Sequence, residues 1–565
     1  MDQYMVYIGG IVVVFGWLIY QAIRTSQERK RRLLERIRSE YGAYANREYE
    51  YDDFHSISHY FEKKHKNRGD LFTIDDITWN DLDLDQVFLA MNTTRSSIGQ
   101  DYLYDLLRRP SFDPAELQER DRLATFFDSH PEEREHCQML LSEVGYTRKI
   151  SLMDYIDNIR TLEQNSNLPH YLCIGLLVAS VALLAVDPEV GVLLLIGSLI
   201  YNVASYLREK GKVESYFMCI QAIVRLVQCS DKLKKMKSPE LADYMGRLKN
   251  ASSVFQSLKR DADLMGSPSQ VNGSIIEAFL DYVRMMLHVD LICYNNALRK
   301  IQPHMEEVMT MWETIGELEA GIAIASFRKA LPMCCKPEFT GKNRLHMKNG
   351  YHPLISKPVA NTLETYRPVL LTGSNASGKS TFLKTVAINA ILAQTIDTVL
   401  AQEYEAPMYR IYSSMALRDD LSSKESYYMV EIRSLKRIMD AGKNKESKVM
   451  CFVDEVLRGT NTVERIAASA KVLQKLSQDG VMCFAATHDI ELTQLLEQYY
   501  ENYHFTEDIV EGDVQFSYRL HKGRATSRNA IKLLGMMGYE EQVIKEAEQT
   551  ANHFLESGEW KLMGL

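Results

Sequence analysis

The stretch VLLTGSNASGKSTFLKT, residues 369–385, decides the fold of the C-terminal part of the chain. It matches G-x-x-x-x-G-K-[ST] at 373–380, directly after an apolar run and directly before a helical run that starts at Phe382. In that context the glycines let backbone N–H groups close around phosphates, and the positive end of the helix adds to the attraction. The stretch therefore predicts a phosphate-binding loop (P-loop) between a strand and a helix. Its predicted nucleotide contacts are Gly373, Ser374, Asn375, Ala376, Ser377, Gly378, Lys379, Ser380 and Thr381.

Two acidic residues strengthen this prediction. In a P-loop site the lysine, here Lys379, reaches the β- and γ-phosphates of ATP, and the following hydroxyl, here Ser380, ligates Mg²⁺. The run VMCFVDE (449–455) is an apolar strand that ends in Asp454 and Glu455. Asp454 is placed to hold the hydration shell of Mg²⁺, and Glu455 to act as general base for the attacking water. The pattern predicts an ATP hydrolase.

A third apolar run, VMCFAATHD (481–489), ends at His488, which is predicted to sense the γ-phosphate. From about residue 335 such short runs alternate with helical stretches, which is the pattern of a parallel α/β sheet. Residues 335–565 are therefore predicted to form an α/β P-loop ATPase domain.

The N-terminus carries a different signal. Residues 5–23 are free of charge and would span about 28 Å as a helix, close to the ~30 Å core of a bilayer. Asp2 precedes the run and RKRR (29–32) follows it, which is the reverse of a secretory signal peptide. Residues 1–23 are predicted to be a transmembrane anchor whose C-terminal end faces the cytoplasm. The alternative is a buried core helix.

A second apolar block covers residues 171–207. Its two arms, 171–186 and 190–207, are separated by a turn signal at Asp187-Pro188, and REKGK follows the second arm. The arms are short for spanning, so a buried helical hairpin is the alternative to a transmembrane hairpin. If both apolar blocks span, the soluble parts lie on one face, and the protein is predicted to be a multi-pass protein of the cell membrane whose soluble domains face the cytoplasm.

The rest of the chain reads as helical. Residues 24–70 are polar and are predicted to be a juxtamembrane helix and linker. Residues 71–168 and 208–334 are predicted to be the first and second parts of a helical core, from apolar residues at helical spacing. The fold class is thus multidomain: membrane helices, an all-α body and an α/β ATPase domain. A formal net charge of -9 argues against a globally basic nucleic-acid binder, though not against a local basic patch.

The α/β domain resembles the ATPase domain of the MutS family of DNA mismatch-repair proteins, which is related to the ABC ATPases. The resemblance is carried by GYHPLI (350–355), the P-loop stretch (372–395), DDLSSKESYYMVEI (419–432), FVDEVLRGTNTVERIAASAKVL (452–473) and ATHDIELT (486–493). The helical body, from LDLDQVFLAMNTTRSSIGQDYLYDLL to residue 339, is similar to the core and lever region of that family.

The resemblance implies a homodimer with an ATP site at each interface. It implies that Ser426 reaches the nucleotide of the partner subunit, that His352 and Asn361 flank the nucleotide base, and that RGTNT (458–462) communicates across the dimer. The sequence also departs from the family. Residues 1–70 have no counterpart of its mismatch-reading domain, and Leu457 stands where the family has glycine.

The family's activity on DNA makes one surface of interest. Residues 231–266 of the lever carry Lys232, Lys234, Lys235, Lys237, Arg247, Lys249, Lys259 and Arg260. These cations could neutralise phosphates of duplex DNA without reading its sequence. Two functions stay open: a membrane-anchored clamp on double-stranded DNA, or an ATP-driven dimeric clamp or scaffold that acts on a protein partner or on the membrane.

Overall fold

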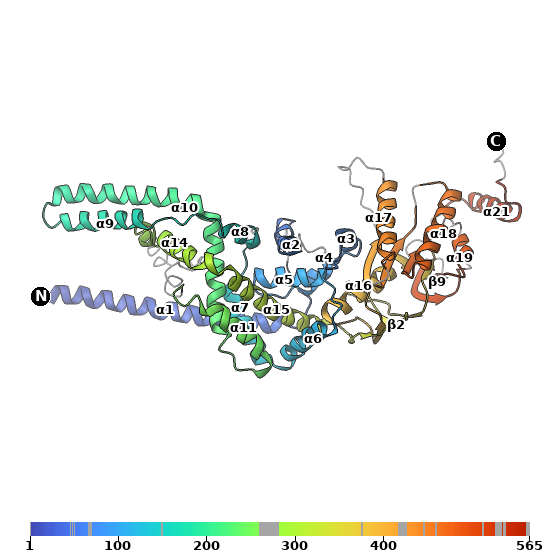
Figure 1. Ribbon diagram of the computed structural model, residues 1–565, viewed down its shortest axis with the longest axis horizontal. Helices are drawn as coiled ribbons and strands as arrows, with labels where there is room; N and C mark the ends of the chain where they lie inside the picture. The colour runs from blue at the N-terminus through green and yellow to red at the C-terminus, as the bar shows by residue number, and fades with distance from the viewer. Residues whose placement is uncertain are drawn as a thin grey trace. The chain divides into compact units, whose positions relative to one another are not determined.

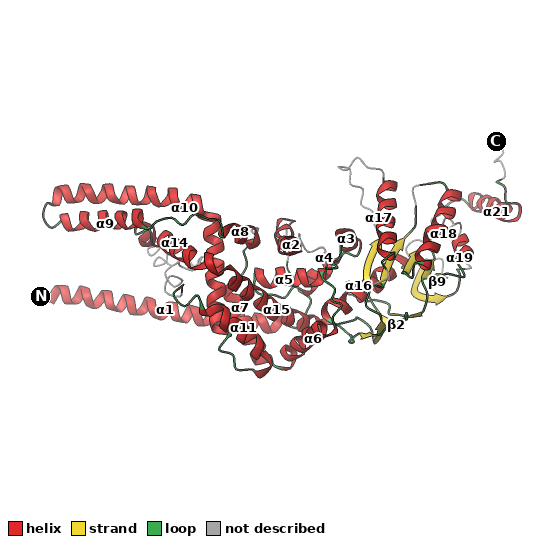
Figure 2. Cartoon of the chain, viewed as in Figure 1, coloured by secondary structure: helices red, strands yellow, loops and turns green. Residues whose placement is uncertain are grey.

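The computed structural model describes residues 2–45, 47, 49, 51–65, 71–147, 151–258, 282–374, 377–415, 427–444, 447–457, 460–510, 513–525, 531, 534 and 538–560. The chain divides into two compact units. The first, the helical body, comprises residues 1–69, 91–105 and 122–330. The second, the α/β unit, comprises residues 70–90, 106–121 and 331–565. Among the residues that the structure describes, strands lie in the C-terminal part of the chain, and the part before it is helical (Figure 2).

The helices before residue 331 form where the sequence carries apolar residues at helical spacing and helix start signals. They are α1 (Asp2–Glu40), α2 (Tyr51–His65), α3 (Asp76–Asp81), α4 (Leu84–Met91), α5 (Ser97–Arg108), α6 (Pro114–Ser129), α7 (Pro131–Val144), α8 (Leu152–Ile159), α9 (Leu168–Leu183), α10 (Pro188–Leu233), η1 (Pro239–Leu241), α11 (Ala242–Ser253), α14 (Val289–Ile301), η2 (Gln302–His304) and α15 (Met305–Ala330).

The helical body is organised around α15, which is buried along most of its length and packs against α7, α10 and α11. The charged residue Glu319 lies in this core with only 2% of its surface exposed. Its carboxylate accepts hydrogen bonds from the backbone N–H groups of Arg95 and Ser96 and from the Ser96 hydroxyl, at the start of α5. Glu319 therefore supplies partners for N–H groups that a helix start leaves unpaired.

Helix α1 docks on this body at its C-terminal end. Arg38 makes a two-bonded ion pair with Glu135 at 2.9 and 2.8 Å, and the Tyr41 hydroxyl bonds Asp128 at 2.7 Å. Ile37 is 1% exposed. Residues 24–70 were predicted to be a juxtamembrane helix and linker. In the structure α1 continues to Glu40, and α2 as well as α1 contributes buried side chains.

Helices α9 and α10 form an antiparallel hairpin (Figure 1). Asp187 caps α10 by accepting a hydrogen bond from the Val190 N–H at 3.3 Å, with Pro188 as the first helical residue. The apolar block predicted at 171–207 is thus helical, but α10 continues without a break to Leu233. Within the described residues, Pro188–Glu214 is the one helix long and apolar enough to cross a membrane, and α9 is a shorter apolar helix.

The side chains of most of residues 1–19 are outside the described set, so the predicted anchor at 5–23 is seen as the backbone of α1 and a few exposed residues such as Trp17 and Tyr20. Of the predicted membrane helices, the described residues therefore support one candidate span.

The α/β unit contains two sheets. The larger has the order β10-β9-β4-β8-β7-β6, and the smaller the order β1-β5-β2-β3. In the larger sheet β4, β6, β7, β8 and β9 run parallel, and β10 is antiparallel to β9. The strands are β1 (Glu338–Phe339), β2 (Leu345–Gly350), β3 (Asn361–Thr365), β4 (Val369–Thr372), β5 (Glu403–Ala406), β6 (Arg410–Ser414), β7 (Val449–Asp454), β8 (Met482–Ala486), β9 (Glu501–Val510) and β10 (Asp513–Lys522), and the helices are α16 (Lys379–Ile396), α17 (Tyr427–Gly442), α18 (Thr462–Gln478), α19 (Ile490–Leu495) and α21 (Glu541–Ser557).

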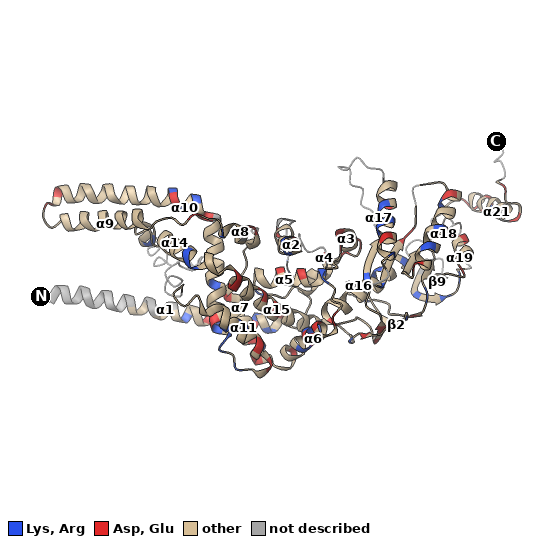
Figure 3. Ribbon diagram, viewed as in Figure 1, with Lys and Arg blue, Asp and Glu red and all other residues tan. Residues whose placement is uncertain are grey.

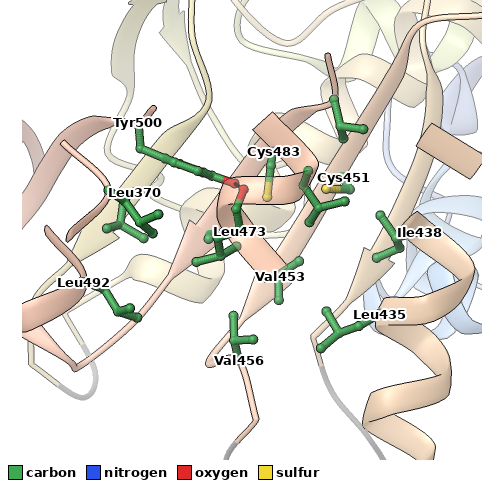
Figure 4. Close-up of a cluster of buried hydrophobic side chains, with 14 of the residues drawn as sticks. Leu370, Leu435, Ile438, Cys451, Val453, Val456, Leu473, Cys483, Leu492 and Tyr500 are labelled. Atoms are coloured by element: carbon green, nitrogen blue, oxygen red, sulfur yellow. Dashed lines mark hydrogen bonds between the residues drawn. The ribbon is translucent and has the colours of Figure 1, made fainter. Parts of the chain in front are cut away.

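The core of this sheet is a cluster of buried side chains from the strands and from α17, α18 and α19 (Figure 4). Leu435 and Ile438 of α17 contribute to it beside the strand residues Cys451 and Val453. Strands such as β7 and β8 are covered on both faces, and accordingly they are continuous apolar runs rather than alternating ones.

The boundary of the α/β unit differs from the predicted one. Residues 70–90 and 106–121 were predicted to belong to the helical core at 71–168, but they belong to the α/β unit. Buried hydrogen bonds hold these two segments to the α/β unit. Asp81, only 2% exposed, accepts hydrogen bonds from the Ser413 hydroxyl at 2.6 Å and from the Met415 N–H at 2.9 Å, at the end of β6. The Arg120 guanidinium similarly donates to the Thr395 carbonyl.

Candidate nucleotide site

The candidate site lies at the carboxyl edge of the three adjacent parallel strands β4, β8 and β7. The P-loop follows β4, His488 follows β8, and Asp454 ends β7. Ligands of open α/β sheets bind at this edge, because the loops that leave parallel strands meet there. The topology thus brings together residues that are more than 100 positions apart in the sequence.

Two glycines shape the loop. Gly373 has φ +146° and Gly378 has φ +104°, values that residues with a side chain rarely adopt. A Cβ atom on Gly373 would also lie 2.9 Å from the Ser377 hydroxyl and 3.1 Å from the Phe505 carbonyl. Gly378 precedes the first turn of α16, so the N-terminus of α16 opens directly onto the loop. Thr381 lies exposed in this first turn.

Lys379 is held inside the loop. Its Nζ donates to the carbonyl oxygens of Gly373 at 2.8 Å and Ser374 at 2.7 Å, and the residue is 5% exposed. The His488 Nε2 lies 3.5 Å from the same Nζ. A buried ammonium group that is fixed in a phosphate-sized loop is suited to binding an anion.

The Ser380 hydroxyl donates a hydrogen bond to the Asp454 carboxylate. These two side chains come from α16 and β7, so the contact joins the P-loop helix to the acidic strand end. Both present oxygen atoms, the ligands that Mg²⁺ prefers. They are the residues that would hold Mg²⁺ in this site.

Glu455 and His488 form the next pair. The His488 Nε2 lies 2.9 Å from the Glu455 Oε1, and the side chains are 36% and 23% exposed, respectively. Glu455 adopts φ +54°, which turns its side chain out of the line of β7. The pair therefore borders the loop with one carboxylate and one imidazole that remain open to a ligand or a water molecule.

A cavity of about 550 Å³ adjoins these groups. Its lining includes Gly350, His352, Ile355, Lys357, Pro358, Val359, Asn361, Ser377, Gly378, Lys379, Ser380, Thr381, Phe382, Thr385, Glu455, His488, Phe505 and Tyr518. The cavity has the size of a small-ligand site and combines apolar walls with a few polar groups.

His352 stands in the wall of this cavity. Burial, together with the positive charge of Lys384, lowers the pKa of His352 to about 4. Its Nδ1 accepts a hydrogen bond from the Leu354 N–H at 3.2 Å. A neutral ring is therefore presented to the cavity at neutral pH, which suits contact with an uncharged heterocycle better than contact with a phosphate.

Asn361 is fixed by strand β10. It donates to the Tyr518 carbonyl at 3.0 Å and accepts from the Leu520 N–H at 2.8 Å. The tie holds Tyr518, which has φ +53° and is 45% exposed, beside Gly378 at the cavity wall. Sequence reasoning missed Tyr518, because no short motif surrounds it and its position depends on the irregular register between Phe516 and Leu520.

The residues present fit a nucleotide with Mg²⁺. The clearest sign is the Ser377 hydroxyl, which lines the cavity, is buried, and has no hydrogen-bond partner among the residues that the structure describes. A ligand oxygen would supply that partner. Three other predicted contacts, Asn375, Ala376 and Ser426, lie outside the described residues.

On the predicted DNA-contacting surface, several of the cations form ion pairs with acidic residues of the same chain. Lys232 pairs with Glu143, Lys234 with Asp231, and Arg247 with Glu317. Lys235, Lys237 and Lys249 are exposed, whereas Lys259 and Arg260 lie outside the described residues. A groove of about 840 Å³ is lined by Lys232, Lys235 and Lys237 and also by Glu132, Glu133 and Glu240. Basic and acidic residues both occur along this part of the body (Figure 3), so the described surface is mixed in charge.

In comparison with known proteins, the family match lies within the α/β unit. Residues 369–555 match the family model described as MutS domain V. This range begins at β4 and includes the P-loop, Asp454, Glu455 and His488.

Three curated relatives carry the name DNA mismatch repair protein MutS. The protein from Pseudothermotoga lettingae is 33% identical over 38% of this chain and 27% of its own length. Those from Thermotoga maritima and Thermus thermophilus are 28% and 32% identical, over 45% and 36% of this chain and 33% and 25% of their own lengths. The matches thus span about a quarter to a third of these relatives.

Proposed function

We propose that this chain, a member of the MutS family through its domain V, is a membrane-anchored ATPase that hydrolyses ATP at a dimer interface. The observation that carries the proposal is the meeting of Lys379, Ser380, Asp454, Glu455 and His488 at one edge of the sheet, beside a cavity of about 550 Å³.

In the proposed mechanism the P-loop binds the phosphates of ATP. Lys379 exchanges the carbonyls of Gly373 and Ser374 for phosphate oxygens, and Ser377 gains a hydrogen-bond partner. Ser380 and Asp454 would hold Mg²⁺, which would offset the negative charge of the phosphates. His352, Asn361 and Tyr518 line the part of the cavity that would take the base.

Glu455 is the proposed general base. It takes a proton from a water molecule as the water oxygen attacks the γ-phosphorus and the bond to the β–γ bridging oxygen breaks, which yields ADP and phosphate. His488, 2.9 Å from Glu455, orients this carboxylate and contacts the γ-phosphate side of the site. Ser426 of each subunit is proposed to complete the site of the other, in a homodimer.

The proposed ATPase activity is tested by measuring ATP binding and hydrolysis for the full-length wild-type protein and the full-length Glu455→Gln variant. The wild-type protein should hydrolyse ATP when Mg²⁺ is present, and Glu455→Gln should bind ATP with similar affinity but turn over at least about a hundredfold more slowly. Undiminished turnover by Glu455→Gln would remove the general-base assignment. Absence of nucleotide binding by the wild type would remove the proposed function.

Membrane anchoring is proposed from α10 and the hairpin. The most apolar part of Pro188–Glu214 is only 22% buried, unlike the core helix of a soluble protein. Leu172, Leu193 and Ile200 are 65%, 74% and 65% exposed. With α1 as a further anchor, the soluble parts would face the cytoplasm, where ATP is available.

What the dimer grips is proposed to be double-stranded DNA, with Lys235, Lys237 and Lys249 contacting phosphates. A specific observation favours a second candidate: three of the described cations of this surface are already paired with acids. The second candidate is an ATP-driven clamp or scaffold on a protein partner or the membrane.

Duplex DNA binding by Glu455→Gln with and without ATP, across a salt series, separates the two. A DNA clamp should bind more tightly with ATP and lose affinity steeply with salt, because counterions are released on binding. No binding at low salt would favour the second candidate.

A further inference from the structure

The loop that leaves β7 carries two strained residues. Glu455 has φ +54° and Leu457 has φ +60°, both in the left-handed region. A bulky residue such as leucine is rarely found there, and such conformations persist only where the surroundings enforce them. The conformation of this loop decides where the Glu455 carboxylate points.

Three hydrogen bonds enforce it, one for each residue of the loop. The Glu455 N–H donates to the Ala486 carbonyl of β8 at 2.9 Å. The Val456 carbonyl accepts from the Ser469 hydroxyl of α18 at 3.2 Å. The Leu457 N–H donates to the Glu431 carboxylate of α17. The first partner is a backbone carbonyl of the sheet, whereas the second and third are side chains from the helices α18 and α17.

Glu431 is unusual for an acidic residue because it is only 4% exposed. It lies in the first turns of α17, directly after the segment 416–426 that contains Ser426. Val456 and Leu457 belong to the same buried cluster as Leu435 and Ile438 of α17 (Figure 4). A buried carboxylate that accepts from a backbone N–H forms a strong bond and is costly to leave unpaired. The start of α17 and the loop after β7 are therefore held together by both packing and a charged hydrogen bond.

We propose that Glu431 is a positioning residue for Glu455: by holding the Leu457 N–H it fixes the strained loop that aims the Glu455 carboxylate, and it couples that aim to the position of α17. This inference rests on the proposed ATPase function. It gives α17 a role in catalysis as well as in core packing. A shift of the first turn of α17 would move the loop that carries Glu455 through the hydrogen bond between Glu431 and the Leu457 N–H. A subunit in which α17 is displaced would bind ATP but hydrolyse it slowly.

The test compares full-length Glu431→Ala, Glu431→Gln and Asp440→Ala. Asp440 is an acid of the same helix that pairs with Lys436 at the surface, so its removal controls for the loss of a carboxylate from α17. The Gln variant keeps an oxygen that can accept from the Leu457 N–H. Affinity for ATP and kcat are measured separately.

We expect Glu431→Ala to bind ATP within about twofold of the wild type and to lose about tenfold to a hundredfold in kcat, as expected when a catalytic group is misplaced by about 1 Å. Glu431→Gln should recover kcat to within about fivefold, because a neutral acceptor gives a weaker bond than a charged one. Asp440→Ala should match the wild type.

Two results would overturn the proposal. If Glu431→Ala turns over at the wild-type rate, Glu431 does not position the base. If Glu431→Ala loses ATP affinity and kcat together and Glu431→Gln does not recover kcat, its role is structural. Both results are distinguishable from failure of the proposed function, which would appear as absence of turnover in the wild type itself.

Discussion

At the scale of single residues, Glu319 links the pH of the solution to the stability of the helical body. Burial raises the pKa of Glu319 to about 7 from an ordinary value of 4.5, although hydrogen bonds from Ser96 and Arg95 oppose the shift. Below pH 4.5 both the folded and the unfolded chain carry the proton. As the pH rises, the unfolded chain ionises first, so the contribution of Glu319 to stability declines until the folded state also ionises near pH 7.

Glu319→Gln should therefore stabilise the protein at pH 8, by on the order of 3 kcal/mol, and have little effect at pH 4. Glutamine cannot ionise, yet its amide oxygen can still accept from the backbone N–H groups at the start of α5. Denaturant titrations at both pH values measure the difference. The exposed Glu306→Gln on the same helix is the control, and an equal effect of Glu319→Gln at the two pH values would contradict this account.

Lys379 gives the second prediction at this scale. Replacing Lys379 by alanine removes the ammonium that faces the predicted phosphates, and the loss of a charged hydrogen bond of about 1.5–3 kcal/mol weakens nucleotide binding by about tenfold to a hundredfold. Titration with a fluorescent ATP analogue measures it. Lys475→Ala, which removes a lysine of α18 that pairs with Asp479 at the surface, should bind as the wild type does.

The residue scale also shows where sequence reasoning stops. Lys379, Ser380, Asp454, Glu455 and His488 were predictable because each follows an apolar strand in a short motif. Tyr518 was not, because its place at the cavity depends on a register shift in β10. Glu431 was not, because its role depends on the backbone angles of Leu457, which no sequence pattern reports.

At the scale of elements, the strands β4, β7 and β8 and the helix after the P-loop were predictable, since buried parallel strands are continuous apolar runs. The membership of residues 70–90 was not. It depends on the buried Asp81 finding its partners at the end of β6, more than 300 positions away in the sequence. The spacing of apolar residues predicts that such a segment is a helix, but it does not predict which domain the helix joins.

The α9–α10 hairpin gives a prediction about its surroundings. In full-length protein in bilayers, a Leu193→Trp variant should show added fluorescence that brominated lipid chains quench, because residue 193 would lie in the hydrocarbon region. A Val254→Trp variant, at an exposed position outside the hairpin, should show added fluorescence that these lipids leave unchanged. Equal behaviour of the two variants would place the hairpin outside the bilayer.

At the scale of the whole molecule, the proposed composite sites predict complementation between defective subunits. A Lys379→Ala subunit has a defective P-loop but keeps Ser426, whereas a Ser426→Ala subunit has the reverse defect. Each alone should hydrolyse ATP poorly. Mixed in equal amounts they should recover roughly a quarter of the wild-type rate, because half of randomly formed dimers pair the two and each such dimer has one complete site. No recovery after mixing would argue that each subunit works alone.

The uninterrupted course of α10 has a consequence for where such a molecule can work. α10 is helical over all of its 46 residues, and it runs from the turn of the hairpin into the helical body with no break in the helix between them. With the hairpin in a bilayer, the helical body would be joined to the membrane by a helix rather than by a flexible linker, which would keep the body near the membrane. It stands at a fixed height above the lipid, and whatever it grips has to arrive at the membrane surface.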